Sequence, residues 1–141
     1  MHHLIYLSQA TRPLSTKALT SLVEQARQAN ERQQLTGVLV YGNKRFIQLL
    51  EGEQAALEAA YARISQDPRH QHLYKVADYP LAARQFTECP LAFQALSPAQ
   101  FAHITGHLAP TRSGQRIPLY NPVATSFIET LRALVQLPPA N

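Results

Sequence analysis

The sequence has one cysteine, Cys89, and no tryptophan among its 141 residues. A single cysteine excludes a disulfide framework and any metal site built from several thiolates, and it favours a reducing compartment. No apolar run approaches the roughly 20 residues of a membrane-spanning helix, and the amino-terminal apolar run is too short for a signal peptide. We therefore expect a soluble, cytoplasmic protein with one globular domain and no membrane partner.

The sequence also has no concentrated charge of either sign. Its formal net charge is +4, but the basic residues are scattered and interleaved with acids, without a basic stripe or an aromatic-basic motif. Nucleic acid is therefore not an expected partner. His103 and His107 have the i, i+4 spacing that can bind a metal, but no third ligand accompanies them, and we expect no metal site.

Glycine is missing where one class of small α+β enzyme would need it. An acyl phosphatase requires a glycine loop after its first strand to cradle an anion, and the stretch SQATRP offers Arg12 but no glycine. No nucleophile-base pair or pair of carboxylates stands out either. We therefore predict that the chain is not an enzyme.

The apolar residues that are present follow strand and helix periods. HLIYLSQ alternates with period 2, which places Tyr6 and Ser8 on one face of a strand. Leu19, Leu22 and Val23 have helical spacing. The patterns predict strands over 2–8, 35–41, 45–50, 73–82 and 84–93, and helices over 15–30, 53–67, 98–107 and 122–137. Pro90 lies inside the last strand, which should therefore be an edge strand or carry a bulge.

The order βαββαββ with trailing helices predicts a ferredoxin-like α+β fold. Right-handed crossovers place both main helices on one face of a mixed sheet. The carboxy-terminal helices have apolar stripes and should cover the other face. We expect residues 1–95 to form the core domain, and residues 96–141 to form a helical extension that packs on the sheet, mediates oligomerisation, or both.

One polar group interrupts the strand RFIQLLEG. Burial of the Gln48 amide without a hydrogen bond would cost roughly 1–3 kcal/mol. Tyr6 can be its neighbour because strands 1 and 3 lie side by side in this fold, and a Tyr–Gln bond leaves amide capacity for a third group. Asn30, Arg69 and His70 could converge there on a planar heterocycle. Alternatively, Tyr6 and Gln48 only satisfy each other, Asn30 is a helix C-cap, and the Arg-His pair is solvated.

Three stretches together resemble a BLUF domain, the flavin-binding family of blue-light sensors. They are HLIYLSQA, ANERQQLTGVLVYGNKRFIQLLEGE and ISQDPRHQHLYKVADYPLAARQF, and the resemblance covers about residues 2–93. The family signature combines a tyrosine in strand 1, an asparagine ahead of LTG, the glutamine of FxQxLEG and an Arg-His pair after helix 2. In this sequence these are Tyr6, Asn30, Gln48, Arg69 and His70.

The resemblance implies an oxidised flavin between the two helices, usually FAD, with FMN possible. Gln48 would bond both Tyr6 and the flavin ring, Asn30 and Arg69 would hold its carbonyl and N3 edge, and His70 would line the site. In that family, blue light drives an electron and then a proton from the tyrosine to the flavin through the glutamine. The glutamine hydrogen bonds are rearranged afterwards.

The sequence departs from the family at three places. Ala29 occupies a position that is often polar, and Cys89 and Leu91 replace a tryptophan and a methionine of the fifth strand. Without tryptophan, Tyr6 is the expected electron donor. We interpret Cys89 as a small buried hydrophobe rather than a redox group.

The resemblance implies a short photoreceptor in which residues 1–95 bind flavin and no output enzyme follows. It would signal through the sheet and the carboxy-terminal helices to a homo-oligomer or to an unidentified protein partner. The alternative is a flavin-free interaction module that has kept the fold, a hypothesis motivated by Ala29, Cys89 and Leu91.

Overall fold

The computed structural model describes residues 1–80, 82–86, 90–106, 128–129 and 133. No helix within these ranges is both long and apolar enough to cross a membrane. The elements in chain order are β1 (His2–Ala10), α1 (Thr16–Arg32), β2 (Thr36–Gly42), β3 (Arg45–Gly52), α2 (Gln54–Ser65), β4 (His70–Pro80), β5 (Ala92–Ala95) and α3 (Pro98–Gly106).

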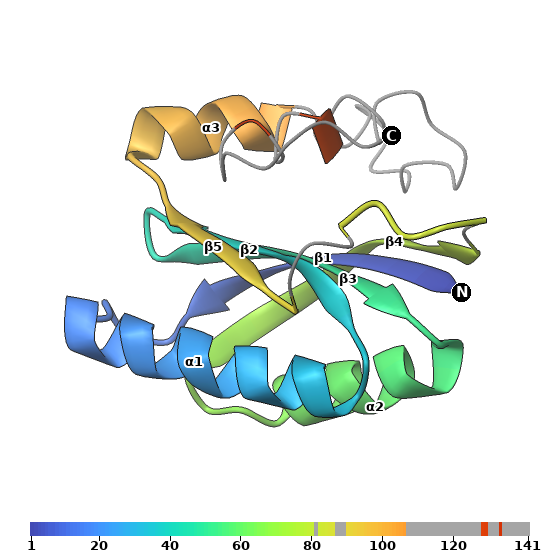
Figure 1. Cartoon of the computed structure of the whole chain (residues 1–141). Helices are drawn as coiled ribbons and strands as arrows, with labels where there is room; N and C mark the ends of the chain where they lie inside the picture. The colour runs from blue at the N-terminus through green and yellow to red at the C-terminus, as the bar shows by residue number, and fades with distance from the viewer. Residues whose placement is uncertain (81, 87–89, 107–127, 130–132, 134–141) are drawn as a thin grey trace.

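The five strands form one mixed sheet in the order β4-β1-β3-β2-β5. The central strands β1 and β3 are antiparallel, and their register places Tyr6 directly opposite Gln48. β5 is parallel to β2 at one edge. Helices α1 and α2 cover one face of the sheet and α3 lies over the other (Figure 1). The predicted ferredoxin-like α+β architecture is confirmed.

Local sequence signals explain the first helix and the central hairpin. The Ser15 hydroxyl caps α1 by accepting a hydrogen bond from the Ala18 amide at 3.1 Å, because the first amides of a helix lack partners within the helix. The β2–β3 turn uses positive φ angles at Asn43 (52°) and Lys44 (60°). Two consecutive positive φ angles match the right-handed twist of a hairpin.

The face opposite α1 and α2 is a closed apolar layer. Ile5, Ile47 and Leu49 from the sheet belong to one buried cluster with Phe101 and Ile104 of α3. Ile128 also packs against this cluster, although most of the helix predicted over 122–137 lies outside the described residues. The prediction that carboxy-terminal helices cover this face therefore holds for α3.

The prediction of a strand over 84–93 is wrong at residues 84–86 and 90–91, and residues 87–89 lie outside the described residues. The strand β5 spans only Ala92–Ala95, and residues 84–86 are not extended in a ladder. Pro90 has no N–H to donate, and the Gln85 and Phe86 amides donate to the Glu51 carboxylate at 2.6 and 2.8 Å instead. The preceding strand β4 is also longer at its start than predicted, because it begins at His70.

Candidate functional site

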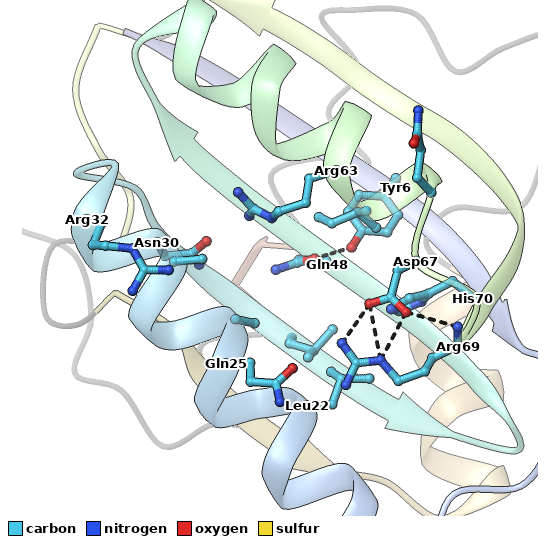
Figure 2. Close-up of a pocket in the computed structure, with 15 residues that line it drawn as sticks. Tyr6, Leu22, Gln25, Asn30, Arg32, Gln48, Arg63, Asp67, Arg69 and His70 are labelled. Carbon is cyan, nitrogen blue, oxygen red and sulfur yellow. Dashed lines mark hydrogen bonds and ion pairs between the residues drawn. The ribbon is translucent and has the colours of Figure 1, made fainter.

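A cavity of about 420 Å³ lies between α1 and α2 on the helix-covered face of the sheet. Its walls come from both helices, the three central strands and the loop after α2 (Figure 2). All five residues predicted from the sequence line it: Tyr6, Asn30, Gln48, Arg69 and His70. The fold thus brings together side chains that are up to 64 positions apart in sequence.

Tyr6 and Gln48 form a hydrogen-bonded pair at the base of the cavity. The Tyr6 hydroxyl donates to Gln48 Oε1, and both side chains are buried. Burial, and after it the neighbouring Tyr61, raises the pKa of the Tyr6 phenol far above its ordinary value, so the phenol stays protonated. The nitrogen end of the Gln48 amide points away from Tyr6 (Figure 2). This end is available to a third group.

Asn30 lies in the last full turn of α1 and is 1% exposed. The helix continues to Arg32 and its C-cap is Gln33, so the alternative that Asn30 is the helix C-cap is wrong. The Asn30 side chain lines the cavity, and its Nδ2 donates to the Pro90 carbonyl at 3.1 Å. The Asn30 amide therefore touches both the cavity and the segment that enters β5.

Arg69 is held by an ion pair in the loop after α2. Its Nη2 donates to Asp67 Oδ2 at 2.7 Å, and its Nε donates to both carboxylate oxygens. This bonding lowers the pKa of Asp67 and raises the pKa of Arg69. The Arg69 side chain is 38% exposed, so solvent screens the pair. Its guanidinium reaches the cavity already paired with Asp67.

His70 is fixed by two contacts at the cavity wall. The Ser8 hydroxyl lies 3.0 Å from His70 Nδ1, and the Phe46 ring centroid lies 4.6 Å from that of His70. Burial is the main cause that lowers the pKa of the imidazole, which favours the neutral ring at neutral pH. The period-2 pattern of the first strand already put Ser8 on the face of Tyr6, so this support could have been found from the sequence.

Several polar lining residues were missed by the sequence analysis. Arg63 extends from α2 and Arg32 from the end of α1, on different walls of the cavity (Figure 2). Neither arginine forms an ion pair with any described residue. The only sequence signal for Arg63 was its place beside Ile64 on the apolar face of the helix. The two guanidinium groups make the cavity attractive to a ligand with carbonyl or phosphate oxygens.

The fold and this cavity define a small α+β domain with a cavity between two helices whose lining suits a planar, oxygen-bearing ligand. A family model described as "Sensors of blue-light using FAD", BLUF, matches residues 1–92. The chain belongs to the BLUF family. The family model thus agrees with the fold and with the sequence signature. Domains of this family bind flavin and sense blue light.

The names of similar proteins and solved structures also refer to activation by light or to BLUF. Photoactivated adenylate cyclase subunit beta from Euglena gracilis is 42% identical over 83 residues, which are 59% of this chain and 10% of the relative. The chain thus spans about a tenth of that relative. The solved structure "BlsA photo-activated state" has a TM-score of 0.74 at 21% identity and covers 99% of this chain and 98% of its own. The solved structure "BlrP1 BLUF" has a TM-score of 0.62 at 33% identity, and the match covers 67% of this chain and 64% of that chain.

Proposed function

We propose that this protein is a blue-light photoreceptor that binds an oxidised flavin, FAD by preference, non-covalently in the cavity between α1 and α2. The observation that carries the proposal is the buried Tyr6–Gln48 pair, whose amide has a free end at the cavity wall. The ligand-binding residues would be Tyr6, Asn30, Gln48, Arg69 and His70.

The cavity walls fit the shape and chemistry of a flavin ring. Leu22, Leu39 and Ile64 supply apolar surface for the ring faces, as pockets for planar heterocycles generally do. Amides and guanidinium groups supply the donors that an edge with two carbonyls requires, and Asn30 Oδ1 can accept from a ring N–H. Arg63 and Arg32 join this set as further donors.

The bound flavin would supply a light-absorbing electron acceptor. The Tyr6 phenol has a strongly raised pKa, so it does not release a proton unless it is oxidised. If an electron left Tyr6 for that acceptor, the phenol proton could move along the existing hydrogen bond to Gln48 Oε1 while an N–H proton of Gln48 Nε2 passed to the acceptor, so the amide would stay neutral. A carboxamide can exchange donor and acceptor roles without a change in net charge. The hydrogen bonds around Gln48 can therefore be rearranged while the site stays neutral.

The departures from the family pattern affect packing more than the polar wall. Ala29 lines the cavity without a polar group, and Leu91 is buried in a cluster with Leu22 and Leu39. Cys89 lies outside the described residues. The flavin-free interaction module remains the second candidate because of these replacements. A division at residue 95, a homo-oligomer, an unidentified protein partner and a cytoplasmic location belong to the same proposal and stay predictions.

An absorption spectrum of the purified protein, in the dark and under blue light, tests this function. We expect a structured flavin band that shifts to the red and returns in the dark. Tyr6→Phe should keep the flavin but lose the shift, because the replacement ring has no transferable proton. Gln48→Ala should also lose the shift.

Tyr74→Phe is the matched control, since Tyr74 is 48% exposed on β4 and lies outside the lining of the cavity. This variant should shift like the wild type. A full light-induced shift in Tyr6→Phe would exclude Tyr6 as the electron donor. A protein that stays colourless after incubation with FAD would instead support the flavin-free interaction module.

A further inference from the structure

The segment that enters β5 is held from α1 by two side chains. Asn30 Nδ2 donates to the Pro90 carbonyl at 3.1 Å, and Arg27 Nε donates to the Leu91 carbonyl at 3.3 Å. The two anchors differ in one respect. Asn30 lines the cavity, whereas Arg27 does not line it and pairs with Glu24 at 2.7 Å.

β5 is a short edge strand with four residues, none of them fully buried. Besides the two anchors, it is held by its pairing with β2, its one neighbour among the described strands, and by the packing of Ala92 and Phe93 against the buried clusters. Short strands with exposed hydrogen bonds open at low free energy, so one lost anchor can change their opening measurably. The chain then continues from Leu96, whose amide donates to the Tyr41 carbonyl at 2.8 Å, directly into α3.

α3 follows β5 in the chain and packs on the other face of the sheet. Phe101 and Ile104 pack on Ile5 and Ile47, on the sheet face opposite the cavity. A change in how β5 is seated therefore moves or loosens an element that the cavity does not touch. The path from the cavity to α3 contains one side-chain hydrogen bond, from Asn30 to Pro90, followed by continuous backbone.

The Asn30 carboxamide can serve both ends of this path at once. It has two N–H donors and one carbonyl oxygen, and a single N–H is used by Pro90. The second N–H and Oδ1 can bind an adjacent carbonyl and N–H of a ligand. Because such a ligand fixes the amide in one orientation, it also fixes the N–H that holds Pro90.

We propose that Asn30 couples occupation of the cavity to the seating of β5 and α3, so that a bound flavin protects β5 through the Asn30–Pro90 hydrogen bond. The proposal rests on the proposed function for the identity of the ligand. Coupling between two sites is reciprocal. Loosening of β5 must therefore weaken flavin binding by the same factor by which flavin tightens β5.

Amide hydrogen exchange over residues 91–96 of the full chain measures the coupling. We expect exchange there to slow by about fivefold or more when FAD fills the cavity of the wild-type protein, at the low end of typical coupling factors. Exchange over 74–79 in β4, none of which lines the cavity, provides the internal comparison for a general change in stability. The absorption band reports how much flavin is bound in each sample.

Asn30→Asp keeps the shape of the side chain and removes the N–H that holds Pro90. In the flavin-free protein, this variant should speed exchange over 91–96 several-fold relative to the flavin-free wild type. Where the variant binds FAD, saturation should no longer slow that exchange. Equal exchange in the two flavin-free proteins would overturn the proposal, whether or not the variant binds FAD.

Arg27→Met is the matched control because it removes the other anchor without touching the cavity. It should speed exchange over 91–96 but keep the response to FAD, and it should weaken FAD binding by the factor that reciprocity requires. A wild-type protein with a full flavin band and unchanged exchange over 91–96 would overturn the coupling alone. A protein that binds no flavin would overturn the proposed function, and the flavin-free comparison would still decide the role of Asn30.

Discussion

His3 is a titratable side chain in the interior that the site does not use. It is fully buried on β1, and neither ring nitrogen has a hydrogen-bond partner among the described residues. The ring stacks on Tyr79 at 4.8 Å, and Nδ1 lies 4.0 Å from Glu51 Oε2. Burial, and after it the neighbouring His2, lowers the pKa of His3 to about 4. The folded protein therefore keeps this ring neutral.

This lowered pKa predicts a loss of stability in mild acid. An unfolded chain binds a proton at His3 below its ordinary pKa of 6.5, whereas the folded chain does so only below about 4. His3 therefore does not lower the free energy of unfolding above pH 6.5. As the pH falls from 6.5 to 4, it should lower the free energy of unfolding by roughly 3 kcal/mol in total. Urea unfolding at pH 7, 6, 5 and 4 measures it.

His3→Phe isolates this effect because it keeps a flat ring and removes the titration. Burial raises the pKa of Glu51, which acts in the opposite direction, so the difference between wild type and variant carries the prediction. That difference should change with pH over the 6.5 to 4 range. A constant difference would show that folding does not lower the pKa of His3.

Single residues also show which parts of the site the sequence could predict. Tyr6 and Gln48 were predictable because a period-2 strand pattern and the family signature both place them on one face. The Asp67–Arg69 ion pair was not predictable, although the two residues are only two positions apart. Its geometry depends on the conformation of the loop after α2. The exposure of Arg63 to the cavity depends on the rotation of α2 against the sheet, which apolar spacing leaves undetermined.

At the scale of elements, apolar periodicity predicted the central strands and the two large helices well. It failed at residues 84–86, where two backbone amides donate to a side chain rather than to a neighbouring strand. The Glu51 carboxylate belongs to β3 and accepts from Gln85 and Phe86. A pattern of alternating side chains contains no information about such a bond, since the donors are backbone groups.

Glu51→Ala should therefore destabilise the connection between β4 and β5. Two buried or half-buried amides would lose their acceptor, and each loss costs about 1–3 kcal/mol. We expect the free energy of unfolding to fall by roughly 2–4 kcal/mol in urea titrations. Glu58→Ala, on the exposed side of α2, is the control and should stay within about 0.5 kcal/mol of the wild type. An equally small effect of Glu51→Ala would show that these bonds contribute little.

The whole molecule follows from topology more than from any single pattern. The order of strands and helices, together with right-handed crossovers, leaves few arrangements for the sheet and puts α1 and α2 on one face. The cavity between them could be expected from that arrangement. Its ligand could not, because apolar walls with several donors suit many planar molecules, and only the family signature selected a flavin.

Flavin binding should raise the thermal stability of the whole domain. A ligand that binds only the folded state stabilises it by about 2.7 kcal/mol at a free concentration of 100 times Kd. For a domain of this size, that corresponds to a rise in Tm of roughly 8 °C. A thermal melt with and without FAD in the dark measures this shift. AMP lacks the isoalloxazine ring of FAD and should produce little change, whereas an equal shift with AMP would show that the stabilisation does not come from binding of the flavin ring.

The position of α3 has a practical consequence for engineering. Its packing face lies across the sheet from the cavity, so a domain joined directly behind α3 would begin on the sheet face opposite the cavity. The attached domain could then be replaced by another without blocking ligand binding in the cavity. The same small core could therefore act as an interchangeable input unit, with linker length after α3 as the design variable.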